Sequence, residues 1–194
     1  MIERIRHIEG LQSARLPADE YAVVHSAWLT LMGMRPNGDL DLIMSSRLRR
    51  ELFSKPNLEG HLGLPGPLEQ RIRIQPMNSP YGAFYGARGI DDVIRNYCIE
   101  IDGVRFIEPR FYFAFKKQRL LGLRASRCSL PWWRHTLMYS FGANRILTRK
   151  ISRDERDFAW LDGFFDRSGH RRAEFQHIPD TAWGLPDRDW RPPS

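Results

Sequence analysis

The chain has 194 residues, of which 42% are hydrophobic and 12% aromatic, and its formal net charge is +7. This composition is that of a folded globular protein and excludes a disordered chain, and the length suffices for one domain with a substantial core. No apolar run is long enough to cross a membrane, and the first residues do not form a signal peptide. Two cysteines without framework or metal-site spacing suit a reducing compartment, so we expect a cytoplasmic protein.

Arginine dominates the positive charge, because only four of the 30 basic residues are lysine. Arginine favours bidentate contacts with phosphate and carboxylate groups. A high-GC genome produces the same bias whatever the function, and we attribute most of the ratio to it. The positive balance still favours an anionic partner such as a nucleotide, a nucleic acid or a phosphorylated surface glycan.

The first half of the chain predicts short helices that alternate with strands. Apolar periodicity, capping serines and turns rich in Pro and Gly mark the boundaries. The expected elements are a lead-in helix (1–17), a buried strand (21–24), a helix opened by His25-Ser26 and ended by the turn 36–38, a strand (39–44), a helix (47–53) capped by Ser45-Ser46, and a half-exposed strand (70–76).

The second half predicts a hairpin followed by helices. Asp102-Gly103 between two apolar strands is the strongest hairpin signal in the chain. The other expected elements are a loop (78–89), a short helix (91–95), a helix (110–121), a basic segment rich in Arg and Trp (121–150) with a helical part (136–147), and a last helix through Phe165 that opens with the capping box Ser152 to Glu155.

Two aspartates stand at the start of the second predicted strand. Side chains alternate across a strand, so Asp39 and Asp41 project from one face while Leu40 packs on the other. Two neighbouring carboxylates repel each other unless a cation lies between them, and hard oxygen ligands suit Mg²⁺ that also binds waters and substrate phosphates. The alternative is a polar turn edge after Asn37-Gly38, where aspartate is common.

The order of these features resembles the nucleotidyltransferase superfamily, which has the polymerase-β-like fold. The resemblance rests on Val24-His25-Ser26, Gly33-Met34-Arg35 and Asp39-Leu40-Asp41. It implies a helix start that binds nucleotide phosphates, and two aspartates that hold Mg²⁺ for in-line attack by a hydroxyl.

The second half of the chain adds weaker support for the same resemblance. Small bacterial members of the superfamily often carry the order that is found here in Asp102-Gly103-Val104, Pro109, Lys116-Lys117 and Arg153–Asp157. The resemblance implies catalytic or metal-binding roles for Asp39, Asp41 and Glu100, and nucleotide-binding roles for His25, Ser26, Arg35, Lys116 and Lys117. The alternatives are a structural histidine, an ordinary helix cap and a solvated helix end.

The chain departs from the family pattern at two places. His25 stands where the family has glycine, so an imidazole crowds the approach to the phosphate. The third acidic residue has no match in the predicted strand, because residues 71–75 carry no carboxylate; Glu100 on the hairpin is the substitute that we consider.

These features predict an α/β (α+β) fold with a small mixed sheet flanked by helices. We expect one nucleotidyltransferase-like domain (1–168), with the basic segment (about 121–150) as an insertion, and a proline-rich tail (169–194) that is a wrap or a loose end.

The expected function is Mg²⁺-dependent transfer of a nucleotidyl or phosphoryl-linked group from a nucleoside triphosphate such as ATP to a hydroxyl acceptor. A related alternative is a phosphocholine- or polyol-phosphate-type transferase of surface-polysaccharide assembly. Another class is a non-catalytic member of the fold that binds RNA or a protein partner through the Arg/Trp segment, in which Trp132 and Trp133 stack on bases; a core plug is the competing interpretation.

Overall fold

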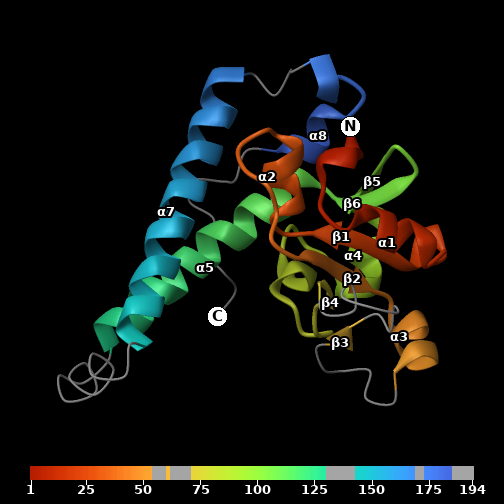
Figure 1. The fold of residues 1–194 in the computed structure, drawn as a ribbon, viewed down its shortest axis with the longest axis horizontal. Coiled ribbons are helices and arrows are strands. Elements are labelled where there is room, and N and C mark those ends of the chain that lie inside the picture. Colours follow the sequence, from red (N-terminus) through yellow and green to blue (C-terminus); the bar gives the residue numbers. More distant parts are fainter. Residues whose placement is uncertain (54–59, 62–70, 130–142, 169–172, 185–194) are drawn as a thin grey trace. The chain divides into compact units, whose positions relative to one another are not determined.

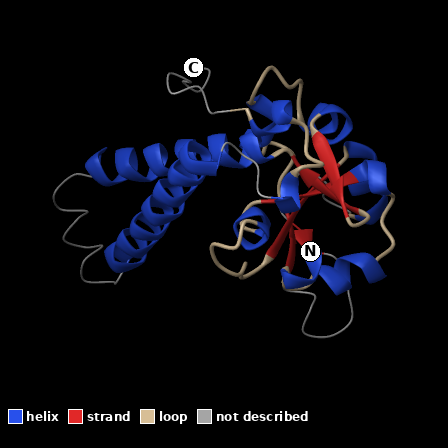
Figure 2. Ribbon diagram, turned by 90° about the horizontal axis from the view of Figure 1, so that it is seen from above, coloured by secondary structure: helices blue, strands red, loops and turns tan. Residues whose placement is uncertain are grey.

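In the computed structural model the chain has an α+β fold with a mixed sheet flanked by helices (Figures 1 and 2). The structure describes residues 1–53, 60–61, 71–129, 143–168 and 173–184. By its internal contacts the chain divides into two units, of which the second is Phe113–His177. The first contains Met1–Tyr112 and the described residues that follow His177.

The first unit contains a six-stranded sheet with the order β3-β4-β2-β1-β6-β5. Its strands are β1 (Tyr21–Val24), β2 (Leu40–Met44), β3 (Gly60–His61), β4 (Ile72–Ile74), β5 (Cys98–Ile101) and β6 (Val104–Ile107). β1 pairs with β2 in antiparallel and with β6 in parallel orientation, and β2 pairs with β4 in parallel orientation. Antiparallel partners complete both edges, β3 beside β4 and β5 beside β6.

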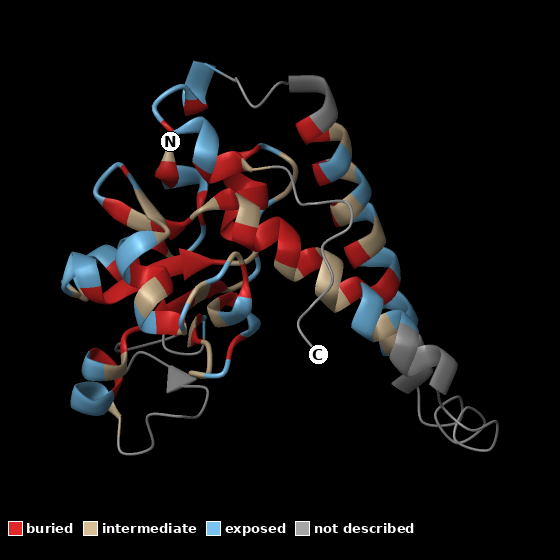
Figure 3. Ribbon diagram, turned by 180° about the vertical axis from the view of Figure 1, so that it is seen from behind, coloured by how far each residue is buried: buried red, intermediate tan, exposed pale blue. Residues whose placement is uncertain are grey.

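The core of this unit lies on the two central strands, which are almost entirely buried (Figure 3). All four residues of β1 are buried, as the apolar run in the sequence predicts. Trp28 is fully buried beside them; its indole N–H donates to the carbonyl of Ile107 at 2.8 Å, and its ring meets Trp183 edge to face. Ile178, Ala182 and Trp183 are buried, so this part of the predicted tail packs in the core of the first unit.

Short helices connect the strands of the first unit. They are η1 (Ile2–Arg4), α1 (Ile8–Ser13), η2 (Ala18–Glu20), α2 (Ala27–Leu31), α3 (Ser46–Leu52), η3 (Pro80–Ala83), α4 (Ile90–Asn96) and α8 (Asp180–Trp183). The single lead-in helix over 1–17 was a wrong prediction, because two separate short elements, η1 and α1, occupy that segment. The predicted cap of α3 is confirmed, since the Ser45 hydroxyl accepts a hydrogen bond from the Leu48 N–H at 3.1 Å.

The predicted hairpin is confirmed in its register and in its turn. β5 and β6 pair with Cys98 opposite Ile107 and Ile101 opposite Val104. Asp102 and Gly103 have φ values of 49° and 74°, and two positive φ values are what the tight turn of a twisted hairpin requires.

Two long helices form the second unit, α5 (Pro109–Ser129), whose first turn belongs to the first unit, and α7 (Ala143–Ser168), with the short η4 (Ala173–Phe175) after them. Within this unit they run antiparallel, because Phe113 packs against Phe165 while Arg124 forms an ion pair with Glu155. α5 extends beyond the predicted end near residue 121. Trp132 and Trp133, to which we assigned base stacking, lie outside the described residues.

The capping box at Ser152 was a wrong prediction for a helix start. α7 already begins at Ala143, so Ser152 is an exposed residue in the interior of the helix. The carboxylates of Asp154 and Asp157 therefore do not lie at a helix N-terminus. They are buried against α5 instead.

Candidate functional site

Asp39 and Asp41 lie where β1 ends and β2 begins, at one end of the two central strands. We call this end of the strands the edge around Asp39 and Asp41. Val24, the last residue of β1, is paired with Asp41, so the turn His25-Ser26 follows directly beside the second aspartate. Asp39 precedes the first residue of β2, and the alternation of side chains places both carboxylates on one face of the strand. The strand pairing and this alternation place both aspartates and the turn His25-Ser26 at the same end of the two central strands.

A buried asparagine fixes the turn that leads into this strand. The side-chain N–H groups of Asn37 donate to the carbonyls of Arg6 and Asp39 at 3.2 and 3.1 Å, and its side-chain oxygen accepts from the Arg6 N–H at 3.0 Å. The Asn37 N–H donates to the Thr30 hydroxyl at 2.8 Å. These bonds join α2 and the N-terminal segment to the start of β2. In the sequence Asn37 was only a turn residue.

The imidazole of His25 contacts the carboxylate of Asp41, with 3.2 Å between Nδ1 and Oδ2, and each side chain is 14% exposed. The backbone of His25 has a φ of 59°, a left-handed conformation that is rare for any residue with a side chain and costs about 1–2 kcal/mol. Its ring also contacts Tyr81, with 5.4 Å between the centroids. The conformation thus explains why glycine suits this position.

Opposing influences act on the pKa of Asp41. Burial raises the pKa, but the hydrogen bond and the charge of His25, the charge of Arg73 and the hydrogen bond that Gln75 donates at 2.9 Å together hold it below its usual value. The carboxylate is therefore ionised at neutral pH. An ionised carboxylate with defined neighbours is suited to accept hydrogen bonds or to bind a cation.

Two arginines lie beside the other carboxylate. β4 is parallel to β2 with Arg73 opposite Asp41, and Nη1 of Arg71 and Nη1 of Arg73 approach the carboxylate of Asp39 at 3.3 and 3.9 Å. The exposed fractions of the side chains are 58% for Arg71, 42% for Arg73 and 33% for Asp39. Residues 71–75 beside β2 therefore carry two cations and no carboxylate. The polar alternation of residues 71–75 was visible in the sequence, but its partner strand was not.

The other predicted nucleotide-binding residues of the first unit lie close in sequence to this edge. Ser26 is the residue before α2, and its side chain makes no capping hydrogen bond, so the ordinary helix cap was not the correct interpretation. Arg35 lies in the loop after α2, where its Nη1 donates to the carbonyl of Pro36 at 3.3 Å.

Within the first unit, Glu100 is not brought to the pair of aspartates, and the two predicted lysines belong to the other unit. Glu100 lies exposed on β5, opposite Arg105, and the order of the strands places β1 and β6 between it and β2. Three strand spacings amount to about 14 Å, which is too far for a shared metal ion. Lys116 and Lys117 lie on α5 in the second unit, where Lys116 is buried between Asp154 and Asp157.

Comparisons with known families, curated proteins and solved structures found no match. The functional interpretation therefore depends on the geometry of the site itself. Within the described ranges no group of three or more His, Cys, Asp or Glu residues is arranged to hold a metal ion. None of the helices described is long and apolar enough to span a bilayer.

Proposed function

We propose that the edge of the sheet around Asp39 and Asp41 is the active centre of a nucleotidyltransferase-like enzyme. The enzyme transfers a nucleotidyl or phosphoryl-linked group from a nucleoside triphosphate to a hydroxyl acceptor. One observation carries the proposal: two carboxylates on one face of β2 lie directly beside the turn that joins β1 to α2, through the pairing of Val24 with Asp41.

The donor set fits a half-site for Mg²⁺. Asp39 and Asp41 offer hard oxygen ligands on one face, and the side chain of Asp39 is 33% exposed, which leaves room for a cation and its waters. Mg²⁺ bound by two carboxylates takes its other ligands from water and from substrate phosphates, and it supplies charge neutralisation of the phosphates. Asp39 and Asp41 are the residues that would hold it.

The neighbouring side chains support binding of an anionic donor. The guanidinium groups of Arg71 and Arg73 lie at the same edge and can form bidentate bonds with phosphate oxygens. The hydroxyl of Ser26 is not used as a helix cap and can donate to a phosphate oxygen. His25 orients the carboxylate of Asp41 through the 3.2 Å contact.

The test is metal and nucleotide binding by charge-neutral variants. Mn²⁺ binding followed by electron paramagnetic resonance, with and without ATP, should weaken at least about tenfold in Asp39→Asn and in Asp41→Asn, since each loses a direct ligand. Asp162→Asn is the matched control, because Asp162 is exposed on α7 in the second unit. Unchanged Mn²⁺ and nucleotide binding in both aspartate variants would refute the proposal.

The arginines of β4 favour a second candidate function, a non-catalytic member that binds an anionic partner without a metal. Here Arg71 and Arg73 supply the positive charge that a cation would otherwise supply beside Asp39. This candidate predicts RNA binding that falls steeply with salt and persists in the Asp39→Asn and Asp41→Asn variants. RNA affinity that hardly changes with salt would count against it.

A further inference from the structure

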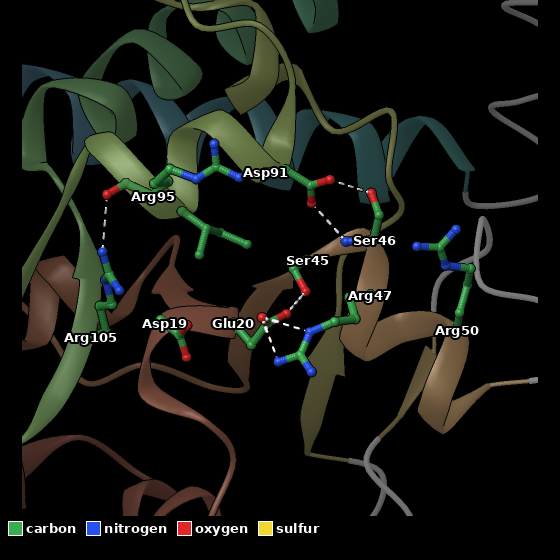
Figure 4. A pocket seen from close by; sticks show the side chains of 10 residues that line it. Asp19, Glu20, Ser45, Ser46, Arg47, Arg50, Asp91, Arg95 and Arg105 are labelled. Atoms are coloured by element: carbon green, nitrogen blue, oxygen red, sulfur yellow. Dashed lines mark hydrogen bonds and ion pairs between the residues drawn. The ribbon is translucent and has the colours of Figure 1, made fainter.

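A pocket of about 450 Å³ opens at the other end of β1 and β2 (Figure 4). It lies among η2, the start of α3, α4 and β6, all within the first unit. Its lining residues are Asp19, Glu20, Ser45, Ser46, Arg47, Arg50, Asp91, Ile94, Arg95 and Arg105. Four arginines among ten residues give the pocket a strongly charged wall.

Two of the three acidic residues in the wall are already engaged in holding its elements together. Glu20 accepts two hydrogen bonds from Arg47, at 3.0 and 2.7 Å, and one from the hydroxyl of Ser45. Asp91 accepts from the N–H and the hydroxyl of Ser46 at 2.7 and 2.6 Å (Figure 4). These bonds fix α3 against η2 and α4, so both carboxylates already have hydrogen-bond partners within the wall.

The remaining arginines of the wall form no hydrogen bond with a carboxylate in the described part of the chain. Arg105 donates from Nη1 to the carbonyl of Ala18 and from Nη2 to that of Arg95, at 3.4 and 3.3 Å, which uses two of its five N–H donors. The side chains of Arg50 and Arg95 are exposed, and Arg95 interacts electrostatically with Asp92, three residues earlier on α4. The hydrogen bonds of Asp91 come from uncharged groups, so Arg50, Arg95 and Arg105 face two carboxylates, those of Asp19 and Asp91. With Arg47 paired to Glu20, the described wall has a formal net charge of +1.

We propose that this pocket binds a small phosphate monoester that also carries hydroxyl groups, such as a sugar phosphate. Arginine forks match phosphate oxygens, and they reach the pocket from two sides: Arg95 and Arg105 on one, Arg50 on the other (Figure 4). The volume is in the range of sites for small metabolites.

The other residues of the wall favour a phosphate ester with hydroxyl groups over one with a nucleobase. Among the described residues of the wall, Ile94 is the only apolar one and none is aromatic, so these residues offer a nucleobase no aromatic stacking surface. The carboxylate of Asp19 can accept hydrogen bonds from hydroxyl groups of the ligand, and the Ser46 hydroxyl oxygen, which donates to Asp91, can still accept one. A compact, polar phosphate ester can bind the arginines through its phosphate and the oxygen atoms of the wall through its hydroxyl groups.

The pocket is separate from the aspartate pair of the proposed active centre. Glu20 and Ser45 lie just beyond the pair Tyr21–Met44, whereas Asp41 pairs with Val24. Four residues of extended chain place the two sites about 14 Å apart along the strands. Binding at the pocket therefore does not depend on the proposed transferase function.

Isothermal titration with ribose 5-phosphate tests the proposal, in low salt at about pH 8, where the phosphate is a dianion, and with EDTA present so that no metal ion contributes. We expect wild-type protein to bind ribose 5-phosphate but not ribose. The variant Arg50→Gln/Arg95→Gln should bind at least about tenfold more weakly, because each arginine contributes charge-assisted hydrogen bonds. Both side chains are exposed, so the fold should persist, which circular dichroism checks.

Two control variants separate this result from its alternatives. Arg4→Gln removes an exposed arginine of η1 outside the pocket and should bind like wild type. Asp39→Asn/Asp41→Asn should also bind like wild type, because the pocket lies at the other end of the strands. The proposal is overturned if wild type does not bind, if Arg50→Gln/Arg95→Gln binds normally, or if Arg4→Gln loses as much affinity.

Discussion

At the scale of single residues, hydrogen bonds and ion pairs decide which charged side chains stabilise the fold. Glu20 precedes β1, and its side chain is 12% exposed. Its carboxylate accepts hydrogen bonds from Ser45, the cap of α3, and from Arg47 in the first turn of α3. The hydrogen bonds from Ser45 and Arg47 lower the pKa of Glu20 and outweigh burial, which raises it. The ionised form of Glu20 therefore stabilises the fold.

A pH series of urea unfolding on wild type and Glu20→Gln tests this. A lowered pKa in the folded state gives stability that is present above the unfolded-state pKa of about 4.3 and is lost as pH falls through the folded-state value. Wild type should be the more stable protein at pH 6, and its advantage over Glu20→Gln should shrink between about pH 5 and pH 3. The control is Glu3→Gln, because Glu3 is exposed; the difference in its free energy of unfolding from wild type should not shrink in this way. A difference between wild type and Glu20→Gln that stays constant with pH would contradict the prediction.

At the scale of elements, packing between helices overrides a local signal. The sequence around Ser152 has the form of a helix start, yet α7 runs through it. Asp154 and Asp157, three residues apart and hence on one face of α7, both lie 2.7 Å from the amino group of Lys116 on α5, and Asp154 also meets Arg119 at 2.8 Å. Two buried carboxylates are thus balanced by two cations from the facing helix.

Removal of one cation from this cluster should be costly. Lys116→Met leaves buried negative charge uncompensated and should lower the free energy of unfolding by about 3–5 kcal/mol. In Lys116→Met/Asp157→Asn the charges balance again, because Arg119 still faces Asp154, so this double variant should be more stable than Lys116→Met.

Thermal unfolding followed by helical circular dichroism measures both variants. The control is Lys117→Met, because Lys117 is the next residue on α5 and is only partly buried. An effect of Lys116→Met as small as that of Lys117→Met would contradict a role of the buried cluster in stability.

At the scale of the whole molecule, the pairing of strands far apart in sequence sets the charge of the candidate site. β2 and β4 lie about 30 residues apart in the chain, and their parallel pairing brings Arg73 opposite Asp41 and within 3.9 Å of Asp39. Like charges repel, so Arg73 opposes a metal ion at this edge while it favours an anionic donor.

Arg73→Gln should therefore change two affinities in opposite directions. We expect Mn²⁺ alone to bind on the order of fivefold more tightly, because one unit of nearby positive charge is gone. Affinity for a nucleoside triphosphate without metal should fall, because a phosphate contact is lost. Electron paramagnetic resonance and titration calorimetry measure these two values; Arg4→Gln is the control, and unchanged affinities in Arg73→Gln would show that Arg73 does not act on this edge.

The sequence by itself determined the local elements. The apolar run of β1, the cap of α3 by Ser45 and the Asp102-Gly103 hairpin were all correctly predicted. Each depends on side-chain alternation, capping or turn geometry within a few residues, which the order of amino acids records directly. The α+β class follows from the same signals.

Only the tertiary structure decided which of the charged residues meet. His25 with Asp41, Lys116 with Asp154 and the arginines around the pocket are neighbours through strand order and helix packing, and no local pattern records that order. The order of the strands in the sheet also places two strands between Glu100 and the aspartates. Electrostatic interactions act over a few ångströms in space rather than along the chain, so the folded arrangement alone fixes the charge of each site.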